Sequence, residues 1–146
     1  MTTVASETRT GRSLVSDELF GSLTHFVTQH DGETTERAER IADQAIAFVA
    51  TAAVATMPMV PSDDVDQGLH AFILHTEAYA TFCDEHAGRF LHHNPAPGAG
   101  CRTLEDVQAA AQAMKTAGFQ VFDELWTVNG ENAAQCDSDC GRPYGN

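Results

Sequence analysis

The segment that most constrains the fold is the apolar, alanine-rich stretch IADQAIAFVATAAVATMPMV at residues 41–60. It carries Asp43 and Gln44 near its start and prolines near its end, so its apolar run is too short to cross about 30 Å of hydrocarbon. Its apolar residues recur at helical spacing and form one inward stripe: Ile41, Ala45, Phe48, Val49 and Ala52. We therefore expect a helix buried in the core of a domain.

Other segments share this helical periodicity, and each expected start carries a serine or threonine that can cap free backbone N–H groups. The expected helices cover residues 16–31, 34–56, 63–87 and 103–117, with a short helical piece at residues 122–126. Gly32 and Gly88 follow two of the expected ends, as is typical of helix C-termini. No segment alternates convincingly between polar and apolar residues, so we predict an all-α fold, a compact bundle of about four helices.

The domain organisation follows from composition and length. A chain of 146 residues with 42% hydrophobic content is long enough for one domain with its own core. We expect a flexible N-terminal leader at residues 1–16, a single helical domain at residues 17–128, and a polar C-terminal tail at residues 129–146 that carries Cys136 and Cys140.

Charge excludes several classes of partner. The formal net charge is -13, with 8 Lys plus Arg against 21 Asp plus Glu, so nucleic acid and anionic membranes would be repelled. The polar N-terminus lacks the apolar core of a secretory signal, which predicts a cytoplasmic protein with reduced thiols. No P-loop or dinucleotide fingerprint is present, so we expect no nucleotide cofactor. A small-molecule or peptide substrate and a homodimer built on the alanine-rich helix both fit these properties.

The candidate site lies in DQGLHAFILHTEAYATFCDEHAGRFLHHNP at residues 66–95, which holds five of the seven histidines. On a helix, His75 and His86 would be about 16 Å apart along the axis, so one ion cannot bind both. Asp66 and His70 are four residues apart and share another face, where a carboxylate can orient a ligand histidine or join it as a ligand. A lone His75 beside aromatic residues is best interpreted as a hydrogen-bonded, half-buried core residue.

A second constellation is expected at the end of the same helix. Cys83 and His86 are three residues apart, and the chain turning back after Gly88 could bring His92 or His93 to them. A His/Cys set of this kind suits zinc or another borderline-soft metal. Partners for the first pair, Asp66 and His70, would have to come from elsewhere, and the tail thiols of Cys136 and Cys140 are candidate ligands.

Three functions compete on these residues. The first is a small metal-binding protein that holds Zn, Fe or Cu, and an open coordination position would make it a metal-dependent enzyme. The second is a metal-free interaction or scaffold module, in which the histidine and tyrosine side chains form a hydrogen-bonded core network. The third is a metal-independent enzyme in which Asp66 orients His70 as a general base.

The ordered string of residues 65–95 also resembles the signature segment of the glycine-rich domain-containing protein-like family. The matching residues are Val65, Asp66, His70, Leu74, Thr76, Tyr79, Phe82, Cys83, Gly88, Phe90, His92, His93 and Pro95. Two positions depart from the family pattern, since Leu69 replaces a usual Trp and Phe72 replaces a second His found in many members. The resemblance implies a small α-helical domain of unassigned biochemistry.

Overall fold

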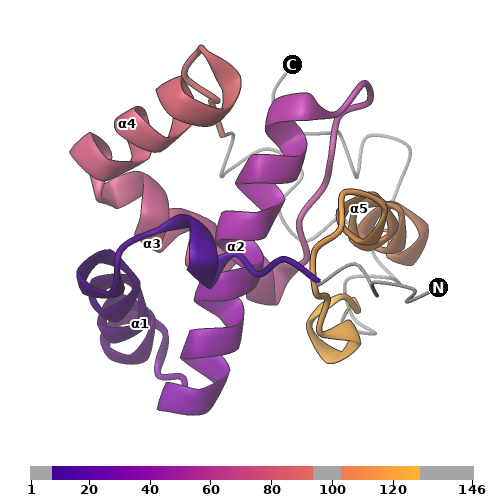
Figure 1. Cartoon of the computed structure of the whole chain (residues 1–146). Helices are drawn as coiled ribbons and strands as arrows, with labels where there is room; N and C mark the ends of the chain where they lie inside the picture. The colour runs from indigo at the N-terminus through magenta and orange to yellow at the C-terminus, as the bar shows by residue number, and fades with distance from the viewer. Residues whose placement is uncertain (1–7, 94–102, 129–146) are drawn as a thin grey trace, which may run out of the picture.

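The computed structural model describes residues 8–93 and 103–128, which form helices packed around one hydrophobic core (Figure 1). The α-helices are α1 (Asp17–Asp31), α2 (Thr35–Val54), α3 (Asp63–Leu74), α4 (Thr76–Ala87) and α5 (Leu104–Thr116), and the 3-10 helices are η1 (Arg12–Leu14) and η2 (Asp123–Leu125). These ranges contain no β-strand, only a single bridge between Arg9 and Phe119. The predicted all-α bundle is confirmed.

Helix α2 runs through the middle of the bundle, with α1, α3 and α4 on one side and α5 on the other (Figure 1). Every residue from 41 to 49 is buried, including the polar Asp43 and Gln44. The periodicity predicted that only one stripe of α2 would be buried. The helix is instead buried on all sides here, because neighbouring helices cover its opposite faces. Neither α2 nor any other helix in the described ranges is long and apolar enough to cross a membrane.

The helix ends match the capping signals in the sequence. Side-chain oxygens of the N-cap residues Ser16, Thr34, Ser62 and Thr103 each accept a hydrogen bond from the backbone N–H three residues later. Gly32 and Gly88 end α1 and α4 in the left-handed conformation, with φ angles of 71° and 68°. Local chemistry therefore accounts for these four helix starts and two helix ends.

The expected third helix is instead two helices, α3 and α4, which meet at His75. The backbone of His75 leaves the helical region, with φ -83° and ψ 67°, although no glycine or proline stands there. Its ring Nδ1 lies 2.7 Å from the carbonyl oxygen of Ala71, which also accepts from its backbone N–H. Beyond the break, Tyr79 and Phe82 pack edge-on against the buried Phe72 ring. The break thus folds α4 back onto the core, and His75 is the half-buried, hydrogen-bonded residue that we expected.

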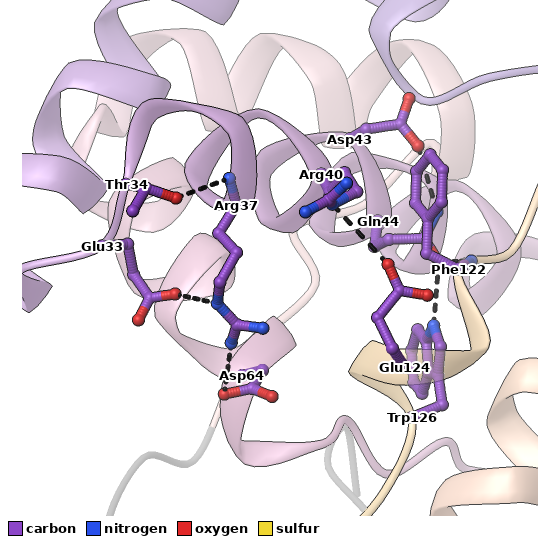
Figure 2. A network of polar contacts seen from close by, with 10 residues as sticks. All are labelled: Glu33, Thr34, Arg37, Arg40, Asp43, Gln44, Asp64, Phe122, Glu124 and Trp126. Carbon is purple, nitrogen blue, oxygen red and sulfur yellow. Dashed lines mark hydrogen bonds and ion pairs between the residues drawn. The ribbon is translucent and has the colours of Figure 1, made fainter.

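Gln44 explains how a polar side chain is stabilised inside α2 (Figure 2). Its Nε2 donates to Asp43 Oδ2 at 3.0 Å and to the carbonyl oxygen of Gln120 at 2.9 Å. Its Oε1 accepts from the backbone N–H of Phe122 at 3.0 Å and from Trp126 Nε1 at 2.8 Å. The amide therefore uses both donors and accepts two hydrogen bonds, and it fixes the segment after α5 to the central helix.

Residues 8–16, which the sequence placed in a flexible leader, make specific contacts with the domain. The backbone N–H of Arg12 donates to Asp43 Oδ1 at 2.8 Å. A Cβ atom on Gly11 would lie 2.0 Å from the Asp43 carbonyl oxygen, so only glycine permits this approach to α2. Backbone hydrogen bonds of 2.8 Å join Arg9 to Gly118 and Gln120.

Candidate metal centre

The first half of α3 is held firmly against α2. Arg37 of α2 forms ion pairs with Glu33 and with Asp64, the latter with 3.2 Å between its Nη2 and Oδ1 (Figure 2). A Cβ atom on Gly68 would lie 2.8 Å from the carbonyl oxygen of Ile41, so the two helix backbones meet closely at this glycine. The residues of α3 that face the candidate site therefore project from a fixed backbone.

Asp66, His70 and His93 form a compact cluster on α3. Asp66 Oδ2 lies 3.3 Å from His70 Nε2, and Asp66 Oδ1 lies 2.9 Å from His93 Nε2. The two imidazole rings are 5.2 Å apart between centroids and tilted by 56°. One ligand atom from each residue lies within 4.8 Å of the other two. The described residues thus bring two imidazoles and one carboxylate to a common point.

The cluster is largely shielded from solvent. The side chains of Asp66 and His93 are 11% and 8% exposed, whereas that of His70 is 41% exposed. The Nε2 atom of His70 is nevertheless buried, and within the described ranges it has no partner in hydrogen-bonding geometry. A buried carboxylate needs compensating charge or ligation, because desolvation penalises the ionised form. The imidazoles beside Asp66 supply part of that compensation, and a bound cation can add to it.

His93 reaches α3 on a piece of chain without regular secondary structure, residues 89–93, which we call the return segment. The Tyr79 hydroxyl donates a hydrogen bond to the Leu91 carbonyl oxygen, and the Phe90 ring packs edge-on against the Tyr79 ring. Burial raises the pKa of Tyr79, and the negative charge of Cys83 raises it further, so the phenol stays protonated as a donor. Periodicity placed Tyr79 on a buried face, but it gave no sign that the hydroxyl would fix the segment that carries His93.

A second carboxylate lies within electrostatic reach of the cluster, at the end of α1. Burial raises the pKa of Asp31, and the positive charges of His30 and His70 partly offset that rise. His30 itself stacks on the Phe26 ring, with 5.1 Å between ring centroids. The end of α1 therefore adds negative potential on the side of His70.

The structure sorts the predicted ligands differently from the sequence. Asp66 and His70 lie together as expected, but His93 joins them instead of joining Cys83 and His86. Cys83 is fully buried beside Tyr79, and the His86 ring packs on Phe82 with 4.1 Å between centroids. The expectation failed because it assumed one continuous helix, whereas the break at His75 lets the return segment reach α3.

The remaining predicted ligands are not part of the cluster. The His92 ring packs against Phe90, with 4.9 Å between centroids, although its neighbour His93 lies in the cluster. Cys136 and Cys140 lie outside the described residues.

Comparison with protein families identifies the chain. The UCP032817-like family model matches residues 16–121, which include all five α-helices and the complete cluster. The chain belongs to the UCP032817-like family. Searches of curated proteins and of solved structures return no significant match. The UCP032817-like name states no reaction, so the function must be argued from the site.

This assignment corrects the resemblance to the glycine-rich domain-containing protein-like family, which is wrong. The resemblance rested on residues 65–95, whereas the UCP032817-like match spans nearly the whole helical domain. The two departures, Leu69 and Phe72, are both core residues, 2% and 0% exposed. Of the shared positions that the structure describes, only Val65, Asp66, Tyr79, Phe82 and Cys83 are buried.

Proposed function

We propose that this protein binds one divalent transition-metal ion through Asp66, His70 and His93, and that the ion keeps an open coordination position. The observation that supports the proposal most is the convergence of three ligand atoms within 4.8 Å of one another. The set of two histidines and one carboxylate is that of catalytic zinc sites and of non-haem Fe(II) sites. With no thiolate in the set, Zn and Fe fit better than Cu(I).

The spacing of the ligand atoms supports metal binding. Ligands at about 2.1 Å from a tetrahedral ion are about 3.4 Å from one another. The carboxylate oxygens of Asp66 lie 3.3 and 2.9 Å from the two imidazole nitrogens, so small adjustments of the side chains suffice. The Nε2 of His70 is buried, lacks a hydrogen-bonding partner in the described ranges and lies near the other two ligand atoms, as a metal ligand would.

Three protein ligands leave room for water or a substrate atom. A bound cation would lower the pKa of that water and polarise a carbonyl or phosphoryl oxygen, as in metal-dependent hydrolysis. Asp66, held by α3, would bind the ion together with the two imidazoles, and the hydrogen bond from Tyr79 would hold the return segment in place. We therefore favour a small metal-dependent enzyme over a purely structural site.

A second candidate is a metal-independent enzyme that uses Asp66 and His70 as an acid–base pair. The 3.3 Å separation of Asp66 Oδ2 and His70 Nε2 favours it, because a carboxylate at that distance can orient an imidazole. This alternative needs no ion. Metal content and metal-dependent stability therefore separate the two functions.

Element-resolved metal analysis of the full chain, purified without a histidine tag, is the deciding experiment. We expect about one equivalent of bound metal, and about 0.1 equivalent or less in Asp66→Asn and His93→Ala. Metal added to the stripped protein should raise the melting temperature by several degrees, because an ion that binds only the folded state stabilises it.

The control is His25→Ala, which removes an exposed histidine of α1 and leaves the cluster intact. This variant should bind metal like the wild type. If the wild-type chain holds less than about 0.2 equivalent of metal and its melting temperature ignores added Zn²⁺ and Fe²⁺, the proposal fails and the acid–base pair is favoured.

A further inference from the structure

A cavity of about 240 Å³ lies next to the cluster, between the second half of α2, residues 55–59, α3 and the return segment. Much of its wall is apolar and includes Phe48, Val49, Ala52, Leu69 and Leu91. His93 lines the cavity as well as belonging to the cluster, so the two share a wall. A ligand in this cavity would therefore lie beside the candidate metal.

One cation on the cavity wall, Arg89, contacts no acid among the residues that the structure describes. Arg89 lines the cavity and is exposed. The other basic side chains in the described ranges each contact an acid or an aromatic ring: Arg9, Arg12, Arg37, Arg40 and Lys115. Within those ranges Arg89 contacts neither, although the chain carries 21 acidic residues and only 8 basic ones. A guanidinium without an acidic partner in the described ranges, beside a cavity lined by both apolar and polar side chains, fits a ligand with an anionic head and a hydrocarbon body.

We propose that this cavity binds a medium-chain monocarboxylate, with the carboxylate on Arg89 and the hydrocarbon chain against α2 and α3. An apolar cavity of about 150 Å³ holds benzene, so by proportion this one holds on the order of ten non-hydrogen atoms. A saturated chain of about eight carbons with a carboxylate has that size. Binding of the carboxylate does not require the metal. Its role as a substrate rests on the proposed function, because His93 belongs to both the cavity wall and the metal site.

Octanoate titrated into the full chain, followed by calorimetry, tests the proposal. We expect saturable binding to one site, weakened about tenfold or more in Arg89→Gln because a charge-assisted hydrogen bond is lost. Lys115→Gln removes the same charge at a distance from the cavity and should bind like the wild type. 1-Octanol, which has the same chain without the charge, should bind Arg89→Gln and the wild type equally.

Ala52→Leu tests the position of the hydrocarbon chain, because the larger side chain fills part of the cavity. It should weaken octanoate and octanol alike by about tenfold, while circular dichroism and the melting temperature verify that it folds. Wild-type protein that does not bind octanoate, or Arg89→Gln that binds it unchanged, overturns the proposal. If octanoate still binds metal-free His70→Ala, the cavity proposal is supported even if the protein proves to bind no metal. If the protein binds metal but not octanoate, only the cavity proposal is refuted.

Discussion

Gln44 of α2 and the cluster of Asp66, His70 and His93 beside α3 are both largely buried and polar. They differ in how their hydrogen bonds are arranged. Gln44 has two donors and two acceptor positions, and each meets a partner in the protein. In the cluster, three ligand atoms converge on one point, and the Nε2 of His70 has no hydrogen-bonding partner in the described ranges.

This difference separates a structural polar group from a candidate functional one. A satisfied amide in the core contributes stability, and its loss leaves several buried groups without partners. In the cluster, by contrast, the three converging ligand atoms are arranged as a metal site would require. Substitutions in the two regions should therefore change different measured quantities.

The largest effect should come from Gln44→Leu. The substitution keeps most of the volume but leaves Trp126 Nε1 buried without its partner, and it removes the partner of the part-buried Phe122 N–H and Gln120 carbonyl oxygen. We expect the free energy of unfolding to fall by about 3–5 kcal/mol, measured by urea denaturation. The exposed Gln112, whose amide contacts only Thr116 at 3.4 Å, is the matched control, and Gln112→Ala should change stability by less than about 0.5 kcal/mol.

Alanine substitutions at two helical glycines should change stability by smaller amounts, and the two changes should have opposite signs. Gly68→Ala places a methyl group 2.8 Å from the Ile41 carbonyl oxygen and forces α3 away from α2, which should cost about 1–3 kcal/mol. Gly21→Ala places the methyl group in open space within α1 and should stabilise by about 0.5–1 kcal/mol. Thermal unfolding of both variants measures the contrast, and a stabilised Gly68→Ala would refute the close approach of the two helices.

Tyr79 should link stability to alkaline pH. Its pKa is raised in the folded state, chiefly by burial, so the stability it contributes is complete below the unfolded value near 10 and is lost as pH rises above it. Tyr79→Phe should cost about 1 kcal/mol at neutral pH and flatten the decline above pH 10. Denaturation at a series of pH values measures this, with Tyr144→Phe, the other tyrosine, as control. If the free energy of unfolding falls with pH equally steeply in the wild type and in Tyr79→Phe, the raised pKa of Tyr79 is refuted.

The smallest effect on stability should come from His70→Ala in the absence of metal. Because the His70 side chain is partly exposed and its Nε2 lies 3.3 Å from Asp66 Oδ2 without hydrogen-bonding geometry, we expect loss of this pair to cost about 0.5 kcal/mol. Metal affinity of the same variant should fall at least about tenfold. A large loss of stability with unchanged affinity would assign His70 to the same structural class as Gln44.

Helix boundaries were predictable because they depend on local chemistry. Ser16, Thr34, Ser62 and Thr103 cap the helices where the sequence indicated. The break at His75 was not predictable, since neither glycine nor proline marks it and its causes are contacts with Ala71 and with the packed core. Tertiary packing overrides local helical propensity there.

The candidate site was half predictable for the same reason. The spacing of Asp66 and His70 by four residues sufficed to pair them on one helix. The third member, His93, arrives through a turn at Gly88 and a hydrogen bond from Tyr79 to the return segment. No local pattern encodes that path, and helical periodicity pointed to Cys83 and His86 instead.

The pairing of Arg9 with the chain around residue 119 has a consequence for the topology of the domain. Backbone hydrogen bonds from Arg9 to Gly118 and from Gln120 to Arg9 join the start of the described fold to the segment that follows α5, and Asp43 and Gln44 bind both segments at one turn of α2. The first described residues therefore lie beside residues 118–120, close to the end of the helical domain. A domain with that geometry can be inserted into a loop of another protein, or given new termini elsewhere, without stretching its own backbone.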